Sequence, residues 1–170
     1  FRFISWDTAS PEFMALAFQT LARNGIRRFC LADPMNDVEA QIACARGVKR
    51  AGGEHVIAAL VFSISPIHDD AHYVARAGTL ASCPDIDAVY IKDPGGLLTP
   101  ARARTIVPAV RAAVHQALAQ RGSTVALYDL RELLAGATSP PPVAALSALA
   151  TIGDASCVDA LAEAYDHVDD

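Results

Sequence analysis

Apolar and polar positions form a repeated unit along the first two thirds of the chain: a short apolar run, a polar residue and then a helical pattern. In the first helical stretch, Phe13, Leu16, Ala17 and Leu21 recur three and four positions apart, as on the buried face of a helix. Residues 55–63 are continuously apolar, which is typical of a strand buried on both faces. We expect strands at 1–5, 28–32, 55–63 and 87–91, and helices at 11–24, 37–52, 69–82 and 100–114.

Strands and helices alternate at a spacing of roughly 30 residues, which indicates βαβ units and a parallel sheet. A doubly wound sheet and a (β/α)₈ barrel both have this pattern. A complete barrel needs about 250 residues, so this chain would hold about half of one. We predict an α/β fold: a partial (β/α) TIM-type barrel of about four βα units, with its strands paired in sequential order. Its two open edges would favour a homo-oligomer, or would be covered on one side by residues 124–168.

Strand-like runs end after residue 114, and helical patterns replace them. Residues 125–134, 143–152 and 157–165 have helical periodicity, and Gly153-Asp154 is a turn that caps the last of them. The proline-rich stretch 139–142 breaks the chain and is expected to be exposed, like Gly122. We predict a partial barrel at 1–114, a linker at 115–123 and an α-helical hairpin segment at 124–170.

Composition excludes several classes of protein. Apolar residues make up 52% of the chain, enough for a packed core, and the net charge of −5 argues against a nucleic-acid surface. The longest apolar runs are much shorter than a membrane span. The cysteines form no C-x-x-C pair and are best explained as buried thiols in a reducing, cytoplasmic setting. They are Cys30, Cys44, Cys83 and Cys157.

Candidate site residues follow the expected strands, because ligands of parallel α/β folds bind at the carboxyl ends of the strands. The candidate catalytic residues are Lys92 and Asp93, and the candidate substrate-binding residues are Asp7, Asp33, Ser65 and His68. Asp37 and Asp69 fit better as helix caps. The remaining histidines have no ligand spacing and fit surface or helix-end positions; they are His55, His72, His115 and His167.

Lys92 has two interpretations. A lysine beside a partly desolvated pocket can lose its proton and then act as a base, form a Schiff base or be carboxylated. Alternatively, Lys92 forms an ion pair with Asp93 or another nearby acid. His68 has the same ambiguity, since it either contacts a substrate or satisfies the turn at Pro66-Ile67.

Three segments together resemble one enzyme family. They are Asp-Pro-Met-Asn-Asp at 33–37, Ile-Ser-Pro-Ile-His-Asp-Asp at 64–70 and Ile-Lys-Asp-Pro-Gly-Gly-Leu-Leu-Thr-Pro at 91–100. In order and spacing they resemble the carboxyltransferase domain of pyruvate carboxylase and the α subunit of oxaloacetate decarboxylase. These enzymes belong to the HMG-CoA-lyase-like metal-dependent barrels. The resemblance covers residues 1–114.

The resemblance implies a chemistry for Lys92, which matches a lysine that is carboxylated in this family and ligates a divalent zinc, manganese or cobalt ion. That metal polarises the carbonyl of pyruvate or oxaloacetate while a carboxyl group passes to or from biotin. The implied partners are therefore a small 2-oxo acid and a biotin carrier domain or subunit.

The family pattern is incomplete in this chain. The paired His-x-His metal ligands expected after the fourth helix are absent, the first-strand acid would precede Phe1, and no lysine has the Ala-Met-Lys-Met context of biotinylation. Residues 124–168 resemble a HEAT repeat, a stacked helix pair that mediates interactions. Two functions therefore stay open: a biotin-dependent carboxyltransferase or decarboxylase, and a non-catalytic remnant that serves assembly.

Overall fold

The first part of the chain alternates helices and strands, as the sequence pattern predicts. The computed structural model describes residues 7–135, 141 and 143–166. In chain order the elements are α1 (Pro11–Arg23), β1 (Arg28–Asp33), α2 (Val38–Arg50), β2 (His55–Val61), α3 (Asp70–Ser82), β3 (Ala88–Lys92) and α4 (Pro100–Gln120). The strand predicted at 1–5 lies outside the described residues.

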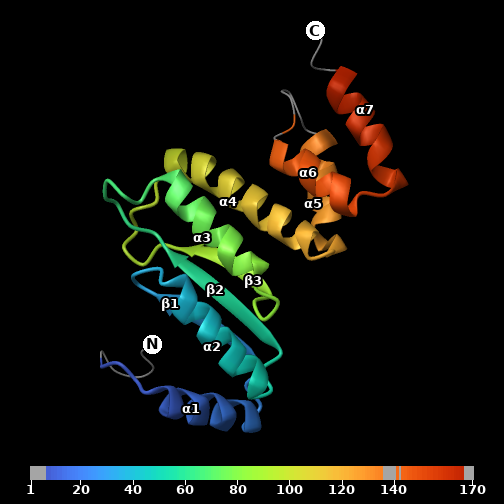
Figure 1. Cartoon of the computed structure of the whole chain (residues 1–170). Coiled ribbons are helices and arrows are strands. Elements are labelled where there is room, and N and C mark those ends of the chain that lie inside the picture. The colour runs from blue at the N-terminus through green and yellow to red at the C-terminus, as the bar shows by residue number, and fades with distance from the viewer. Residues whose placement is uncertain (1–6, 136–140, 142, 167–170) are drawn as a thin grey trace.

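The strands form one parallel sheet of three strands in the order β1-β2-β3 (Figure 1). Cys30 pairs with Ile57, and Ala58 pairs with Val89, so the register is continuous across the sheet. The α/β class and the sequential parallel order are confirmed for these strands. A fourth βα unit and a TIM-type barrel are not confirmed.

Polar side chains begin the helices. Ser10 and Thr99 cap α1 and α4, each of which has a proline in its first turn. Asp37 accepts a hydrogen bond from the Ala40 amide, and Asp69 accepts one from the His72 amide. The prediction that both aspartates are helix caps is confirmed.

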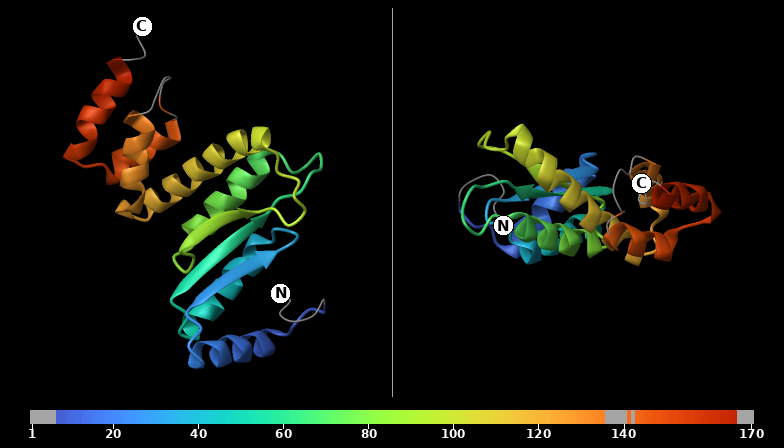
Figure 2. Two further views of the ribbon diagram at one scale, coloured as in Figure 1. Left: turned by 180° about the vertical axis from the view of Figure 1, so that it is seen from behind. Right: turned by 90° about the horizontal axis from the view of Figure 1, so that it is seen from above.

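One face of the sheet packs against α2 and α3, and this layer contains the main apolar core (Figure 1). Phe29, Val56 and Leu60 are buried in it. Seen from behind, the strands lie in front of these helices (Figure 2). The opposite face carries exposed side chains, including Cys30. The prediction of buried thiols is therefore wrong for Cys30, because strand alternation turns it away from the helices.

Helix α4 is longer than the sequence pattern predicts. It continues past residue 114 to Gln120, so residues 115–120 of the predicted linker are helical. The reason is that His115, Ala117 and Ala119 are buried, which stabilises the last two turns. His115 is therefore not the surface or helix-end residue that the sequence suggested. Gly122 follows at φ 72° and is exposed, as expected. The division into domains stays a prediction.

Short helices form the rest of the described chain. They are a 3₁₀ turn (Thr124–Ala126), α5 (Leu127–Ala135), α6 (Val143–Ile152), a second 3₁₀ turn (Ala155–Cys157) and α7 (Val158–Asp166). Their buried side chains, such as Leu130, Leu134 and Leu149, form a second apolar cluster with Ala119 of α4. None of the described helices is long and apolar enough to cross a membrane.

The C-terminal helices do not cover the edge of the sheet. They lie beyond the C-terminal half of α4, away from the strands (Figures 1 and 2). Within the described residues, the alternative in which residues 124–168 shield a strand edge is therefore wrong, and the other alternative, a homo-oligomer, stays a prediction. Of the stretch 139–142 the structure describes Pro141, which is buried rather than exposed. Asp154 accepts a hydrogen bond from the Ser156 amide and caps the turn before α7, as predicted.

Candidate functional site

The candidate site residues lie at the carboxyl ends of the strands. Asp33 ends β1 and Lys92 ends β3. Lys92 pairs in register with Val61, and its carbonyl accepts a hydrogen bond from the Phe62 amide at 2.7 Å. The backbone at Lys92 is therefore tied to the end of β2, which fixes the base of its side chain.

The Lys92 ammonium has no hydrogen-bond or ion-pair partner among the described residues, and the residue is half-buried. The chain has two lysines, and the other one differs in this respect. Lys49 Nζ donates to Asp87 Oδ2 at 2.8 Å and to the Glu54 carbonyl at 2.7 Å. Lys92 thus has the more available amine of the two.

Asp93 does not neutralise Lys92; it organises the loop that follows. Its carboxylate accepts hydrogen bonds from the Leu97 amide at 2.9 Å and the Leu98 amide at 2.8 Å. The bonds from Leu98 and Leu97 are the main cause of a lowered pKa at Asp93. Gly96 adopts φ 63° in this loop, a conformation that favours glycine. Asp93 therefore stabilises the loop that leads into α4. The alternative in which Lys92 forms an ion pair with Asp93 is wrong.

The sheet face that carries Lys92 also carries a tyrosine–cysteine pair. Tyr90 lies on the same face as Lys92, because alternate residues of a strand share a face. Its hydroxyl is 3.1 Å from Cys30 Sγ, across β2. The hydrogen bond with Cys30, followed by partial burial, raises the pKa of Tyr90 to about 12. Tyr90 is therefore a neutral hydrogen-bonding group at ordinary pH.

Asp33 is engaged by its own loop. Its Oδ2 accepts a hydrogen bond from the Asp37 amide at 2.7 Å, and its carbonyl accepts one from the Asn36 amide. Asp33 and Asp37 line a hollow of about 340 Å³ together with Thr8 and Met35. Asp7, the other predicted acid, is exposed just before α1. Within the described part of the chain, the structure does not bring Asp33 into an ion pair with a lysine or arginine.

Ser65 and His68 are in contact with each other. Ser65 Oγ lies 2.7 Å from His68 Nδ1 and accepts a hydrogen bond from the Ile67 amide at 3.3 Å. The His68 ring is 4.6 Å from the His72 ring, and burial is the main cause of a lowered pKa at His72. This cluster organises the turn between β2 and α3, which favours the turn-forming interpretation of His68.

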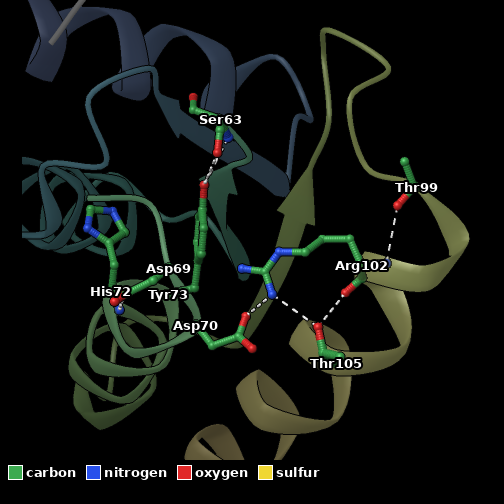
Figure 3. A network of polar contacts seen from close by, with 8 residues as sticks. All are labelled: Ser63, Asp69, Asp70, His72, Tyr73, Thr99, Arg102 and Thr105. Atoms are coloured by element: carbon green, nitrogen blue, oxygen red, sulfur yellow. Dashed lines mark hydrogen bonds and ion pairs between the residues drawn. The ribbon is translucent and has the colours of Figure 1, made fainter. Parts of the chain in front are cut away.

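A polar network secures the start of α3 and α4 (Figure 3). Tyr73 is fully buried, and its hydroxyl accepts a hydrogen bond from the Ser63 amide at 2.8 Å. Arg102 of α4 forms an ion pair with Asp70 of α3. The sequence pattern does not single out Tyr73 or Arg102, since Arg102 is one of three arginines on α4 and a single tyrosine on α3 carries no distinguishing signal.

The described residues do not fit a metal site. No group of three or more His, Cys, Asp or Glu side chains within this part of the chain could hold a metal ion. Lys92 as a carbamate would supply one oxygen ligand, and the carboxylates of Asp33 and Asp93 already accept backbone hydrogen bonds. The geometry therefore supports no step through a bound metal.

Comparisons with known proteins agree with both parts of this arrangement. Residues 142–167 match the model of the PBS lyase HEAT-like repeat, which spans α6 and α7. The chain is also similar in part to carboxyltransferases. It is 34% identical over 90 residues to the methylmalonyl-CoA carboxyltransferase 5S subunit of Propionibacterium freudenreichii, covering 53% of this chain and 17% of that protein.

A second relative is a pyruvate carboxylase subunit of Methanocaldococcus jannaschii. It is 39% identical over 77 residues, which cover 45% of this chain and 13% of that protein. The chain thus spans less than a fifth of the length of these curated relatives. The resemblances to carboxyltransferases and to a HEAT repeat are confirmed as partial matches.

Proposed function

We propose that the α/β part of the chain takes part in carboxyl transfer to or from a 2-oxo acid such as pyruvate or oxaloacetate, with Lys92 beside the reacting carboxyl group. The similarity to two proteins named as a carboxyltransferase and a pyruvate carboxylase subunit supports this class of reaction. The observation that carries the proposal is the Lys92 amine at the carboxyl end of β3, which is unpaired among the described residues.

In this proposal each residue has a limited role. Lys92 Nζ contacts the carboxyl group, and its protonated form offsets the negative charge there. Asp93 is a positioning residue that holds the loop after β3. Asp7, Asp33, Ser65 and His68 stay predicted substrate contacts. Biotin would deliver or accept the carboxyl group, and we expect it on a separate carrier domain or subunit, since neither lysine of this sequence lies in the context of biotinylation.

Isotope exchange tests the proposal. Labelled pyruvate and unlabelled oxaloacetate are incubated with the protein and biotin, and label in oxaloacetate is measured. Lys92→Ala should reduce exchange at least about tenfold, as expected for loss of one charged contact in the transition state. Lys49→Arg is the matched control, because it keeps a cation beside Asp87, and it should retain exchange. Exchange that survives Lys92→Ala would refute the role of Lys92.

A second candidate function is protein assembly without catalysis. The HEAT-like match over α6 and α7 favours it, because such helix pairs present interaction surfaces. Folded protein with no exchange activity would support this candidate, and sedimentation would then show whether the chain forms the predicted homo-oligomer.

A further inference from the structure

A second hollow lies beside the carboxyl end of β2, separate from Lys92. It has a volume of about 270 Å³ and is formed by the loop from β2 to α3, the loop from β3 to α4 and the first turn of α4. Phe62, Ile64 and Leu97 give it an apolar wall, and Ser65, His68 and Arg102 give it a polar one. Lys92 is not part of its lining. The hollow is large enough for a molecule of a few carbon atoms.

Arg102 is held in place on one side and open on the other. Its Nη1 forms the ion pair with Asp70 and donates to Thr105 Oγ1 at 3.0 Å (Figure 3). The Nε and Nη2 groups have no partner among the described residues. The Arg102 side chain retains 30% of its accessible surface and is therefore partly buried. The contacts of Nη1 fix the position of the guanidinium and leave its Nε–Nη2 edge available to a ligand.

The unpaired Nε–Nη2 edge of Arg102 indicates which class of ligand would bind. An arginine Nε–Nη2 edge presents two parallel N–H donors that match the two oxygens of a carboxylate. Asp70 already offsets part of the positive charge, which disfavours multiply charged anions. The apolar wall suits a short hydrocarbon chain, and Ser65 adds a hydroxyl at the rim.

From these observations we propose that this hollow binds a short-chain monocarboxylate, with its carboxylate on the Nε–Nη2 edge of Arg102 and its alkyl chain against Phe62 and Leu97. The site shares Ser65 and His68 with the predicted substrate contacts. It goes beyond the proposed carboxyl transfer, because it does not involve Lys92 and could hold a ligand whether or not the chain is an enzyme.

Titration of the whole chain with butanoate, followed by ¹H–¹⁵N NMR, tests the site. Shifts should be largest for the amides of Ser65, Leu97 and Arg102, with saturation in the millimolar range. Arg102→Gln should weaken binding at least about tenfold, as expected for loss of a bidentate charged pair. Arg102→Lys keeps the charge beside Asp70 but removes the two-point edge, so it should weaken binding similarly and covers the case in which Arg102→Gln unfolds.

Controls distinguish this site from nonspecific binding of anions or of apolar molecules. Arg104→Gln removes an exposed arginine from the same helix and should leave binding unchanged. Butan-1-ol, which has the chain without the carboxylate, and inorganic phosphate should both bind more weakly. Equal binding of butanol or phosphate, or equal weakening by Arg104→Gln, would overturn the assignment. Lys92→Ala should not alter butanoate binding. A negative result in the butanoate titration is therefore distinct from a negative result in the isotope-exchange test of Lys92.

Discussion

The side-chain amide of Asn36 pairs with both backbone polar groups of Val61. Asn36 Nδ2 donates to the Val61 carbonyl at 2.9 Å, and the Val61 amide donates to Asn36 Oδ1 at 2.7 Å. The amide therefore stands where one more residue of β1 would pair with β2. Asn36 is 1% exposed and has φ 53°, a conformation that asparagine tolerates better than most residues. This contact fixes the end of β2, next to Lys92.

Replacing Asn36 should therefore destabilise the fold. Asn36→Gly keeps the backbone conformation but leaves the Val61 amide without its acceptor and the Val61 carbonyl with only the Tyr73 hydroxyl at 3.5 Å, at a cost of about 1–3 kcal/mol. Asn36→Ala should cost more, because alanine at this φ is strained. Urea denaturation of the three proteins measures both effects. A loss below about 0.5 kcal/mol in Asn36→Gly would show that water replaces the amide.

The contact between α4 and α5 should be pH-dependent. His115 Nε2 lies 3.2 Å from Asp129 Oδ2, and Arg111 is paired with the same carboxylate at 3.0 Å. Burial is the main cause of a lowered pKa at His115; Arg111 also lowers it, while Asp129 opposes the shift. His115 of the folded protein therefore binds a proton only at a lower pH than His115 of the unfolded chain, whose pKa is about 6.5.

The sign follows from that difference. The stabilisation is complete above pH of about 6.5 and is lost as the pH falls towards the lowered pKa of folded His115. Thermal unfolding of wild type and His115→Gln between about pH 5 and pH 8 should show a smaller pH dependence in the variant. His72→Asn is the comparison variant. The pKa of His72 is also lowered, but His72 lies on α3 and not at the contact between α4 and α5. Identical pH profiles for wild type and His115→Gln would contradict this assignment.

Asp87 should stabilise the amino-terminal end of the sheet. Its Oδ2 accepts hydrogen bonds from Lys49 and from the Val56 amide at 2.7 Å. Partial burial acts to raise the pKa of Asp87, but these bonds outweigh burial and the pKa is lowered. The stabilisation is therefore present above the unfolded pKa of about 3.9 and is lost as the pH falls through the lower folded value.

Asp87→Ala should cost about 1–2 kcal/mol near neutral pH, because the Val56 amide is left without its acceptor. The difference from wild type should shrink in acid. Glu54→Gln, which removes an exposed ion pair with Arg27, should cost less than about 0.5 kcal/mol and is the matched comparison. Chemical denaturation at two pH values measures both variants, and a difference that stays constant in acid would rule out ionised Asp87 as the cause.

Gly153 should be required for the turn between α6 and α7. A Cβ atom at this position would lie 2.4 Å from the Leu149 carbonyl oxygen. This oxygen belongs to the backbone of α6, so it cannot easily move aside. Gly153→Ala should therefore speed hydrogen exchange in α6 and α7 while leaving β1 to β3 protected. Gly78→Ala, in open space within α3, should instead stabilise by about 0.5–1 kcal/mol. Unchanged exchange in α6 and α7 would mean that the turn rearranges without cost.

Much of the fold follows from local sequence patterns. The structure differs from the predictions where contacts between distant residues determine the conformation. The helix boundaries at Pro11 and Pro100 could be predicted because proline and the preceding hydroxyl act locally. The end of α4 could not, since burial of Ala119 depends on helices that come later in the chain. Cys30 is exposed because the face of the sheet opposite α2 is open, which no local pattern indicates.

The candidate site was predictable in position but not in contacts. Strand ends placed Lys92, Asp93 and Asp33 at one edge of the sheet, as parallel strands require. The partners of the two carboxylates are backbone amides of their own loops, which depend on the path of those loops. Asn36 could not be singled out, because its role depends on Val61, far along the chain.

Carbamate formation at Lys92 is the most direct test of the central claim that this lysine has an available amine at a carboxyl-handling site. The protonated form of Lys92 does not react with CO₂, but the neutral fraction in equilibrium with it takes up CO₂ to form an N–C bond and releases one proton. The product has a distinct ¹³C signal. In ¹³C-labelled bicarbonate, wild type and Lys49→Arg should show a carbamate signal that Lys92→Ala lacks. A signal that persists in Lys92→Ala, or its absence from wild type, would contradict the claim.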